Sequence, residues 1–242
     1  MERVDSPSVA TFYTPGAWSD RVELDEAAAH HAHVKRLVSG DPVQLSSGEG
    51  RLASGVVETI GKRRLVVAVD MATLRETTAP SRMSLWTPIG DRDRMLWLAE
   101  KCTEIGLWEW SPVSYRRSRS VSPRGEGDAF AEKVRLRMIA ALEQSGGAWL
   151  PRVLPERALS TALADIQTPG VLLDANGRSI RDVLPGITAP LRIALGPEGG
   201  LEPEEREQFV RAGWTPVSLA DNVLRFETAA IAAVANFRVH LG

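Results

Sequence analysis

The chain has 242 residues, of which 43% are hydrophobic and 25% are charged, and its formal net charge at pH 7 is −2. A chain of this size buries a substantial core and is long enough for one large domain or two unequal ones. The slightly negative charge argues against wholesale electrostatic adhesion to nucleic acid, although it is compatible with a local basic surface. The single cysteine, Cys102, excludes an intrachain disulfide framework and a cysteine-cluster metal site.

Signals for membrane insertion and export are missing from the sequence pattern. No apolar run approaches the roughly 20 residues that a helix needs to cross a bilayer. The first residues, Met1-Glu2-Arg3-Val4-Asp5, lack the basic-then-apolar pattern of a secretory signal. We therefore expect a cytoplasmic protein without a membrane partner.

The N-terminal part of the chain is rich in short β-favouring runs. These runs are punctuated by turn signals such as Ser47-Gly48 and Gly61-Lys62, which is typical of a compact barrel-like module. A mixed polar segment at residues 73–81 marks its boundary. The predicted elements are strands at residues 42–46, 50–60 and 64–69 and a helix over residues 27–38.

The rest of the chain alternates between strands and helices, which favours a sheet covered by helices on both faces. Cys102 falls on the apolar stripe of the first of these helices, so we assign it to the core. Strands are predicted at residues 83–88, 109–114, 170–174, 191–195 and 215–219, and helices at residues 94–105, 129–143, 203–212 and 226–240.

A glycine-rich turn, Gly196-Pro197-Glu198-Gly199-Gly200, follows one apolar strand and precedes a helix. Gly199 and Gly200 permit positive φ and let a ligand contact bare backbone, and such turns lie at the ligand-binding edge of a parallel sheet. An ordinary strand-to-helix turn remains an alternative interpretation. No lysine followed by serine or threonine comes after the glycines, which argues against a phosphate-binding P-loop, and the dinucleotide fingerprint is also missing.

A second polar segment, residues 218–228, lies between the last strand and the last helix. Asn222, Arg225, Glu227 and Thr228 supply an amide, a cation, a carboxylate and a hydroxyl where a ligand is expected. Two structural interpretations remain open, namely that Thr228 only caps the helix and that Arg225 only pairs with Glu227 at the surface.

Arginines gather in a segment rich in serine, glycine and proline, which includes Arg116, Arg117, Arg119 and Arg124. Such a segment is suited to follow a phosphate backbone, and a solvated flexible loop is the competing interpretation. His30, His31 and His33 are close in sequence, but neighbouring histidines on a helix point in different directions. We therefore expect them at a helix surface or facing RNA, and we expect no metal site.

The two C-terminal segments together resemble the RsmE family of ribosomal small-subunit RNA uridine N3-methyltransferases, within the SPOUT superfamily. The resemblance extends across nearly the whole chain. In chain order, the matching elements are His30-His31 with Arg36, Gly40 and Asp41, then Lys101, Glu104 and Gly106, then Glu143-Gln144-Ser145, then Gly196 to Gly200 with Pro203-Glu204-Glu205, and finally Ser218-Leu219, Val223-Leu224-Arg225 and Glu227-Thr228-Ala229.

The resemblance implies an α/β fold in which a small PUA-like β-barrel domain, residues 1–75, binds RNA and precedes a SPOUT-type methyltransferase domain, residues 80–242, with a deep trefoil knot. No rule for reading a sequence predicts such a knot, because threaded chains are nearly absent among folds. The resemblance further implies a homodimer that binds S-adenosylmethionine in the knot. The implied substrate is a specific uridine of 16S ribosomal RNA in the small ribosomal subunit, methylated at N3.

Residue roles are hypotheses that join the resemblance to chemistry. Uridine N3 is a weakly acidic imide, so Arg225 would stabilise negative charge on a uracil carbonyl, and Glu198, Glu227 or solvent would accept the proton. The residues expected to bind the cofactor are Leu172, Leu173, Gly196, Glu198, Gly199, Gly200, Leu219, Asn222, Leu224 and Thr228, and those expected to bind RNA are Arg36, Arg116, Arg117 and Arg119.

The chain departs from the family pattern mainly where RNA is expected to be held. Gly147 stands where an arginine is common, Glu202 replaces a frequent serine, and Ala10 and Thr11 precede Phe12 where an arginine is usual. Two alternatives therefore remain, a non-catalytic RNA-binding or ribosome-assembly factor and a SPOUT enzyme that acts on transfer RNA.

Overall fold

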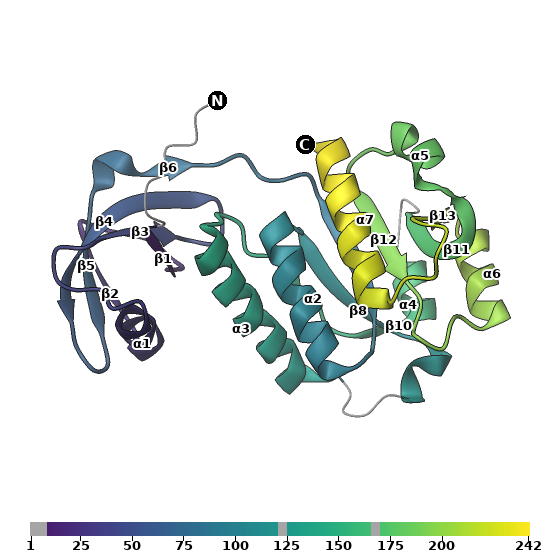
Figure 1. Ribbon diagram of the computed structural model, residues 1–242, viewed down its shortest axis with the longest axis horizontal. Coiled ribbons are helices and arrows are strands. Elements are labelled where there is room, and N and C mark those ends of the chain that lie inside the picture. The colour runs from purple at the N-terminus through teal and green to yellow at the C-terminus, as the bar shows by residue number, and fades with distance from the viewer. Residues whose placement is uncertain (1–8, 121–124, 166–169) are drawn as a thin grey trace. The chain divides into compact units, whose positions relative to one another are not determined.

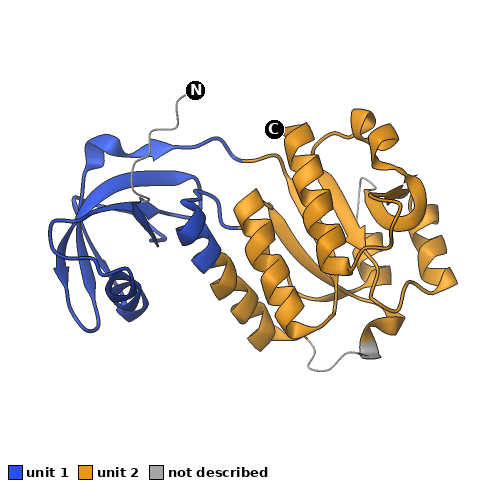
Figure 2. Ribbon diagram, viewed as in Figure 1, with its two compact units in different colours: residues 1–79, 139–150 blue, residues 80–138, 151–242 orange. Residues whose placement is uncertain are grey.

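We analysed a computed structural model of the chain, which describes residues 9–120, 125–165 and 170–242. The chain forms two compact units, shown in different colours in Figure 2. Unit 1 comprises Met1–Ala79 and Ile139–Leu150, and unit 2 comprises Pro80–Met138 and Pro151–Gly242. Unit 1 therefore contains a second piece of chain beyond the N-terminal module that the sequence predicts.

Unit 1 is built on a six-stranded sheet in the order β1-β3-β4-β5-β2, with β6 paired to β4 (Figure 1). The β1–β3 pair is parallel and the other pairs are antiparallel. Phe12, Leu45 and Val67 are fully buried and form the centre of its core. The elements are β1 (Ala10–Tyr13), β2 (Arg21–Leu24), α1 (Glu26–Val34), β3 (Pro42–Ser46), β4 (Arg51–Ile60), β5 (Leu65–Val69), η1 (Met71–Thr73) and β6 (Arg75–Glu76).

Helix α1 begins after Asp25, whose side chain accepts a hydrogen bond from the Ala28 N–H at 3.0 Å. The sequence predicts this helix to continue to Val38, and that prediction is wrong. The helix ends at Val34 because Arg36 adopts a left-handed backbone conformation with φ 57°, and the Leu37 N–H returns to the Ala32 carbonyl.

The second piece of unit 1 is fastened to the sheet by hydrogen bonds. The Glu143 carboxylate accepts from the Tyr13 N–H at 2.9 Å through one oxygen and lies 2.8 Å from His31 Nδ1 through the other. The Ser46 hydroxyl donates to the Gly147 carbonyl, and the Gly50 N–H donates to the Ala148 carbonyl, both at 2.8 Å. A segment far along the chain thus completes the N-terminal sheet.

Unit 2 is an α/β layer structure with a seven-stranded sheet in the order β10-β8-β7-β12-β11-β13 and β9 paired to β8. Every pair is parallel. Its strands are β7 (Met83–Pro88), β8 (Glu109–Ser114), β9 (Arg152–Val153), β10 (Arg157–Ala158), β11 (Val171–Ser179), β12 (Leu191–Leu195) and β13 (Thr215–Ser218).

Helices cover the sheet of unit 2. Helices α2 and α7 pack together, and α7 contacts β7 and β12. Residues of α4 and α6 share another core cluster with Trp86, Leu172 and Ala194 of the strands. The helices are α2 (Arg92–Ile105), α3 (Asp128–Ser145, whose last residues belong to unit 1), α4 (Leu159–Ala164), α5 (Ile180–Val183), α6 (Pro203–Arg211) and α7 (Phe226–Leu241), with 3-10 turns η2 (Arg116–Ser120) and η3 (Leu184–Gly186).

Cys102 is fully buried on α2, as its apolar position predicts, and burial raises the pKa of its thiol. It therefore belongs to the core.

Strand β11 runs beyond the residue 174 at which the sequence predicts its end. Leu173 and Arg178 both pair with Val217 of β13, so residues 174–177 loop out of the sheet. Gly177 makes this return possible, because a Cβ there would lie 2.4 Å from the Val217 backbone nitrogen. Asp174 and Ala175, in this looped-out segment, line a cavity that is described below.

Glu143→Ala is expected to lower the free energy of unfolding by about 1–3 kcal/mol, because it leaves the partly buried Tyr13 N–H and His31 without their acceptor. Chemical denaturation followed by tryptophan fluorescence measures the change. Glu132→Ala is the matched control on the same helix, since the Glu132 side chain is 58% exposed and pairs with Arg135 at 3.6 Å. Equal stabilities of the two variants would contradict a fastening role for Glu143.

Candidate functional site

A cavity of about 610 Å³ opens in unit 2 beside the carboxyl ends of β11 and β12. It is lined by the end of β11, the glycine turn after β12, and the segment that enters α7. The sequence predicts these two C-terminal segments to meet, and they do. Two neighbouring hollows, of about 130 and 780 Å³, continue along the residues that follow β13.

The glycine turn forms a tight reversal between β12 and α6. The Gly200 N–H donates to the Pro197 carbonyl at 2.8 Å, and Gly200 has a φ of +76°, which disfavours any residue with a side chain. Both Gly196 and Gly200 line the cavity. Backbone is therefore presented directly to whatever occupies it.

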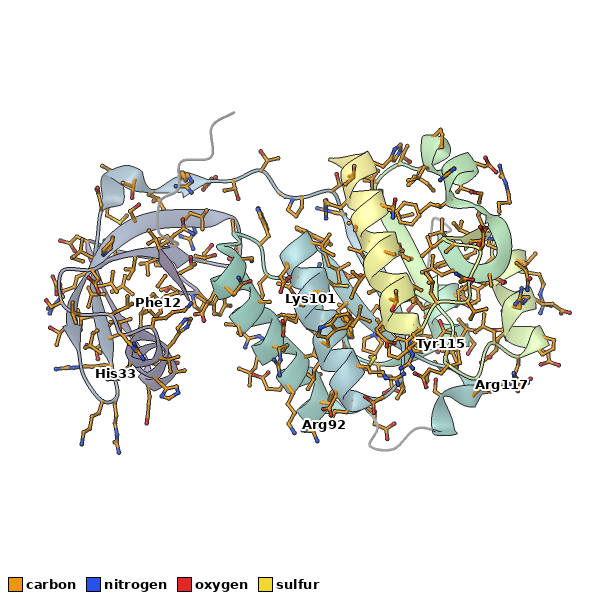
Figure 3. The ribbon with its side chains drawn as sticks, in the orientation of Figure 1. Phe12, His33, Arg92, Lys101, Tyr115 and Arg117 are labelled. Carbon is orange, nitrogen blue, oxygen red and sulfur yellow. The ribbon has the colours of Figure 1, made fainter. Side chains whose placement is uncertain are left out.

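Arg117 clamps this turn from the segment after β8, where Figure 3 labels it with Tyr115. Its guanidinium donates to both carboxylate oxygens of Glu202, at 2.8 and 3.1 Å, and to the Gly199 carbonyl at 2.8 Å. The hydrogen bond from Arg117 holds the pKa of Glu202 below its ordinary value, and the carboxylate raises the pKa of Arg117. Glu202 stands where the family often has serine, so the clamp depends on that departure.

Glu205 is a second tie between the same two segments and is only 4% exposed. Its carboxylate accepts from the Arg116 N–H at 2.8 Å and from the Glu202 N–H at 2.9 Å. Tyr115 is buried beside it, and burial, with the Glu205 charge as a further cause, raises the pKa of the tyrosine. These bonds fix where the glycine turn enters α6.

The segment before α7 presents Arg225 to the cavity. Arg225 is the N-cap residue of α7, so the interpretation of Thr228 as the cap is wrong; Thr228 lies inside the first turn and is exposed. The interpretation of Arg225 as the surface partner of Glu227 is also wrong, since Glu227 is buried and faces another arginine. Within the described residues Arg225 makes no ion pair.

Two arginines form ion pairs beside the cavity. Arg94, in the first turn of α2, pairs through Nη1 with Glu198, and its Nε lies 3.9 Å from Glu227 Oε1. Arg206 of α6 pairs with Asp174 of the looped-out segment. Arg94, Asp174 and Arg206 all line the cavity. Sequence reasoning missed these three residues. A signal existed for Arg94 and Asp174, because both are polar residues at or after the carboxyl end of a predicted strand.

The expected cofactor residues divide into three groups. Leu173, Gly196, Glu198, Gly200 and Leu224 line the main cavity with Arg225, whereas Leu219 and Asn222 line the neighbouring hollows. The third group lines none of these three spaces. Leu172 is fully buried, Gly199 lies against the Arg117 side chain, and Thr228 is exposed.

The arginines predicted to bind RNA are dispersed. Arg116 and Arg117 lie beside α6, where Arg116 also pairs with Glu204 at 3.2 Å. Arg36 is exposed after α1 in unit 1. The side chain of Arg119 and the whole of Arg124 lie outside the described residues.

Among the residues that are described, no cluster of three or more histidine, cysteine or acidic side chains is arranged to hold a metal ion, and no helix is long and apolar enough to span a membrane.

Comparison with models of known families identifies the family of the chain. A model described as an RNA methyltransferase domain matches residues 77–238, and a model of an RNA methyltransferase PUA domain matches residues 24–70. The chain belongs to the RsmE family of RNA methyltransferases. The resemblance inferred from the sequence motifs is thereby confirmed.

Individual RsmE-family relatives match over most of their length. The ribosomal RNA small subunit methyltransferase E of Rickettsia conorii is 27% identical over 240 residues, or 94% of each chain. That of Bacillus subtilis is 26% identical over 222 residues, or 86% of each chain. A crystal structure of the Neisseria gonorrhoeae protein bound to S-adenosyl methionine has a TM-score of 0.84 at 25% identity and covers 96% of this chain and 98% of its own.

Arg117→Ala is expected to raise the pKa of the Glu202 carboxyl toward that of an ordinary glutamate, because the lost hydrogen bond is the largest cause of its lowering. NMR titration of the carboxyl carbon measures it. Arg116→Ala is the control, since Arg116 affects Glu202 only through space and is expected to shift it less. An unchanged pKa in Arg117→Ala would mean that the clamp is not formed in solution.

Proposed function

We propose that this RsmE-family protein transfers the methyl group of S-adenosylmethionine to N3 of a specific uridine in 16S ribosomal RNA. The observation that carries the proposal is the cavity bounded by the glycine turn and the segment before α7. The relative whose structure contains S-adenosyl methionine supports the cofactor. The relatives named as ribosomal RNA small subunit methyltransferases support the substrate.

The residues around the cavity fit this cofactor. A volume of about 610 Å³ lies within the range of roughly 300–1,000 Å³ that is common for small-molecule sites. Leu173, Leu195 and Leu224 offer apolar surface for the adenine, and the turn around Gly200 offers bare backbone. The carboxylates of Asp174 and Glu198 accept hydrogen bonds from donors such as the ammonium group of this ligand. When bound, S-adenosylmethionine supplies an electrophilic methyl group.

Arg225 has the position and the freedom to act on the substrate base. It is an exposed cation that lines the cavity and makes no ion pair within the described residues. Placed beside a uracil carbonyl, it stabilises the negative charge that develops when N3 loses its proton. The carboxylate of Glu198 or Glu227 then accepts that proton.

Other parts of the proposal concern RNA and assembly. Arg36, Arg116, Arg117 and Arg119 contact the RNA backbone, and the PUA-type unit contributes to binding. Two copies form a homodimer, as the resemblance to the RsmE family implies. The chain of unit 2 forms a deep trefoil knot around the cofactor site. Support for the knot comes from the sheet order, in which β12 is inserted between β7 and β11.

Arg225→Ala is expected to abolish methylation while leaving cofactor affinity within a few fold, because the arginine acts on the base. Purified protein and labelled cofactor are incubated with small subunits from cells that lack the gene, and methylated uridines are mapped. Arg211→Ala, an exposed arginine of α6 paired with Glu207 at 3.9 Å, is the control. Equal turnover by Arg225→Ala and the parent would remove Arg225 from the mechanism, and a parent that methylates no ribosomal RNA would refute the function.

Gly200→Val is expected to weaken cofactor binding at least tenfold, because a branched side chain is strained at a φ of +76° and would project from the wall of the cavity. Isothermal titration calorimetry measures the dissociation constant. Gly127→Val carries a comparable strain, at a φ of +77°, in open space away from the cavity. Unchanged binding in Gly200→Val would show that this turn is not the cofactor site.

A further inference from the structure

We infer that the hollow of about 780 Å³ in unit 2 is a second nucleotide site. In it, Arg181 binds a phosphate of the substrate RNA, and Asp221 accepts a hydrogen bond from the amino group of a base that flanks the target uridine. The inference rests on the proposed function and deepens it, because it adds an RNA contact outside the cofactor cavity. Arg181 belongs to no motif of the sequence analysis, and Asp221 lies in the second polar segment without a role assigned there.

The hollow lies where helix α5 and the end of β11 meet the segment that follows β13 (Figure 1). Ser218 and Leu219 line both this hollow and the smaller one of about 130 Å³. Val223 and Leu224 line both the smaller hollow and the main cavity. The three spaces are therefore neighbours along residues 218–225, and a polymer that lies along this segment can occupy the large hollow and the main cavity together.

Hydrogen-bonding side chains line the large hollow. Ser179, Arg181, Asp221 and Asn222 all contribute to its wall, and all four are exposed to solvent, so a ligand can reach them. The Ser179 hydroxyl accepts from the Arg181 N–H at 3.3 Å, which leaves its own proton available for a ligand acceptor. Such a wall suits a polar, hydrated ligand.

Arg181 and Asp221 are opposite charges that line one hollow without pairing with each other. Neither makes an ion pair within the described residues, whereas Arg94 and Arg206, which line the main cavity, are both paired. Asp182, the next residue after Arg181, is exposed and does not line the hollow. The ligand that satisfies both charges carries an anionic group at one end and a hydrogen-bond donor at the other.

A ribonucleotide with an amino group on its base carries both features. A guanidinium is suited to a phosphate, and a carboxylate accepts from the exocyclic amino group of cytidine, adenosine or guanosine. Uridine has no such group, so the flanking base is one of the other three.

The amino-acid part of S-adenosylmethionine also carries an anion and a donor, and the size of the hollow decides between the two ligands. At about 780 Å³ the hollow is larger than the cavity of about 610 Å³ that is proposed to hold the cofactor. An amino-acid tail alone leaves most of it empty, which favours the nucleotide.

The test measures methylation of small ribosomal subunits, prepared from cells that lack the gene, as a function of subunit concentration and of salt. Arg181→Gln is expected to raise KM for the subunits about tenfold and to leave kcat and the calorimetric affinity for S-adenosylmethionine within about twofold, because the contact lies away from the reacting atoms. The slope of log(kcat/KM) against log salt is expected to become shallower by about 0.7, the value for one phosphate contact on a single strand. Arg181→Lys keeps the charge and is expected to recover part of the affinity.

Arg178→Gln is the matched control. Arg178 is an exposed arginine near the end of β11 that makes no ion pair within the described residues and lines none of the three spaces. Its replacement removes the same charge close to the same site, so its KM is expected to stay near that of the parent.

Asp221→Ala tests the base contact through the sign of its effect. A carboxylate that only repels the RNA backbone would lower KM when it is removed, whereas one that holds a base amino group is expected to raise KM about threefold or more. Asp182→Ala is the control, because Asp182 is an exposed aspartate that does not line the hollow.

Four results would overturn the inference while the parent stays active. The first two are equal KM values for Arg181→Gln and Arg178→Gln, and a lowered KM in Asp221→Ala. The third is a cofactor affinity that falls as far as KM rises, which would assign the hollow to the amino-acid part of S-adenosylmethionine. The fourth is dissociation of Arg181→Gln into monomers in sedimentation, which would assign it to an interface between copies. A parent that methylates no ribosomal RNA would instead refute the proposed function.

Discussion

The placement of β12 between β7 and β11 is the constraint on which the site depends. All strands of the unit 2 sheet are parallel, so the chain leaves each of them at the same edge. The turn after β7 therefore delivers Arg94, the excursion from β11 delivers Asp174, and the turn after β12 delivers Glu198 to one cavity. These residues are far apart in sequence and close only because of the strand order.

Charge matching around the cavity leaves one polar group without an opposite charge. Glu198 and Asp174 pair with Arg94 and Arg206, which reduces the field that their charges would otherwise impose. Among the described residues that line the cavity, the guanidinium of Arg225 is the charged group left without an ion pair. A cation beside a carbonyl is one of the groups that an imide substrate requires, which connects the electrostatics of the site to the proposed chemistry.

Unit 1 includes a segment, Ile139–Leu150, that the sequence analysis assigned to the second domain. The histidine-led stretch and the Glu143-Gln144-Ser145 element both match family motifs, and the structure joins them through the His31–Glu143 contact of 2.8 Å. Sequence reasoning placed His31 at a helix surface or facing RNA. Its actual environment is partly buried beside Phe12, with ring centroids 5.3 Å apart, so at least one of the motif's histidines packs within the unit.

The sequence by itself determined the elements whose signal is local. Strands β3, β7, β8 and β12 were predicted at the residues where the structure has them, because short β-favouring runs are recognised from their own side chains. The motifs likewise identified the family and the two segments that border the cavity.

Only the tertiary structure decided which charges meet. The Arg94–Glu198 and Arg117–Glu202 pairs join positions 104 and 85 residues apart. The continuation of β11 depends on Gly177 meeting the β13 backbone, and the end of α1 depends on the left-handed turn at Arg36. The physical reason is that ion pairing, burial and the re-pairing of β11 with β13 depend on distances in space, and the local pattern of residues does not encode those distances.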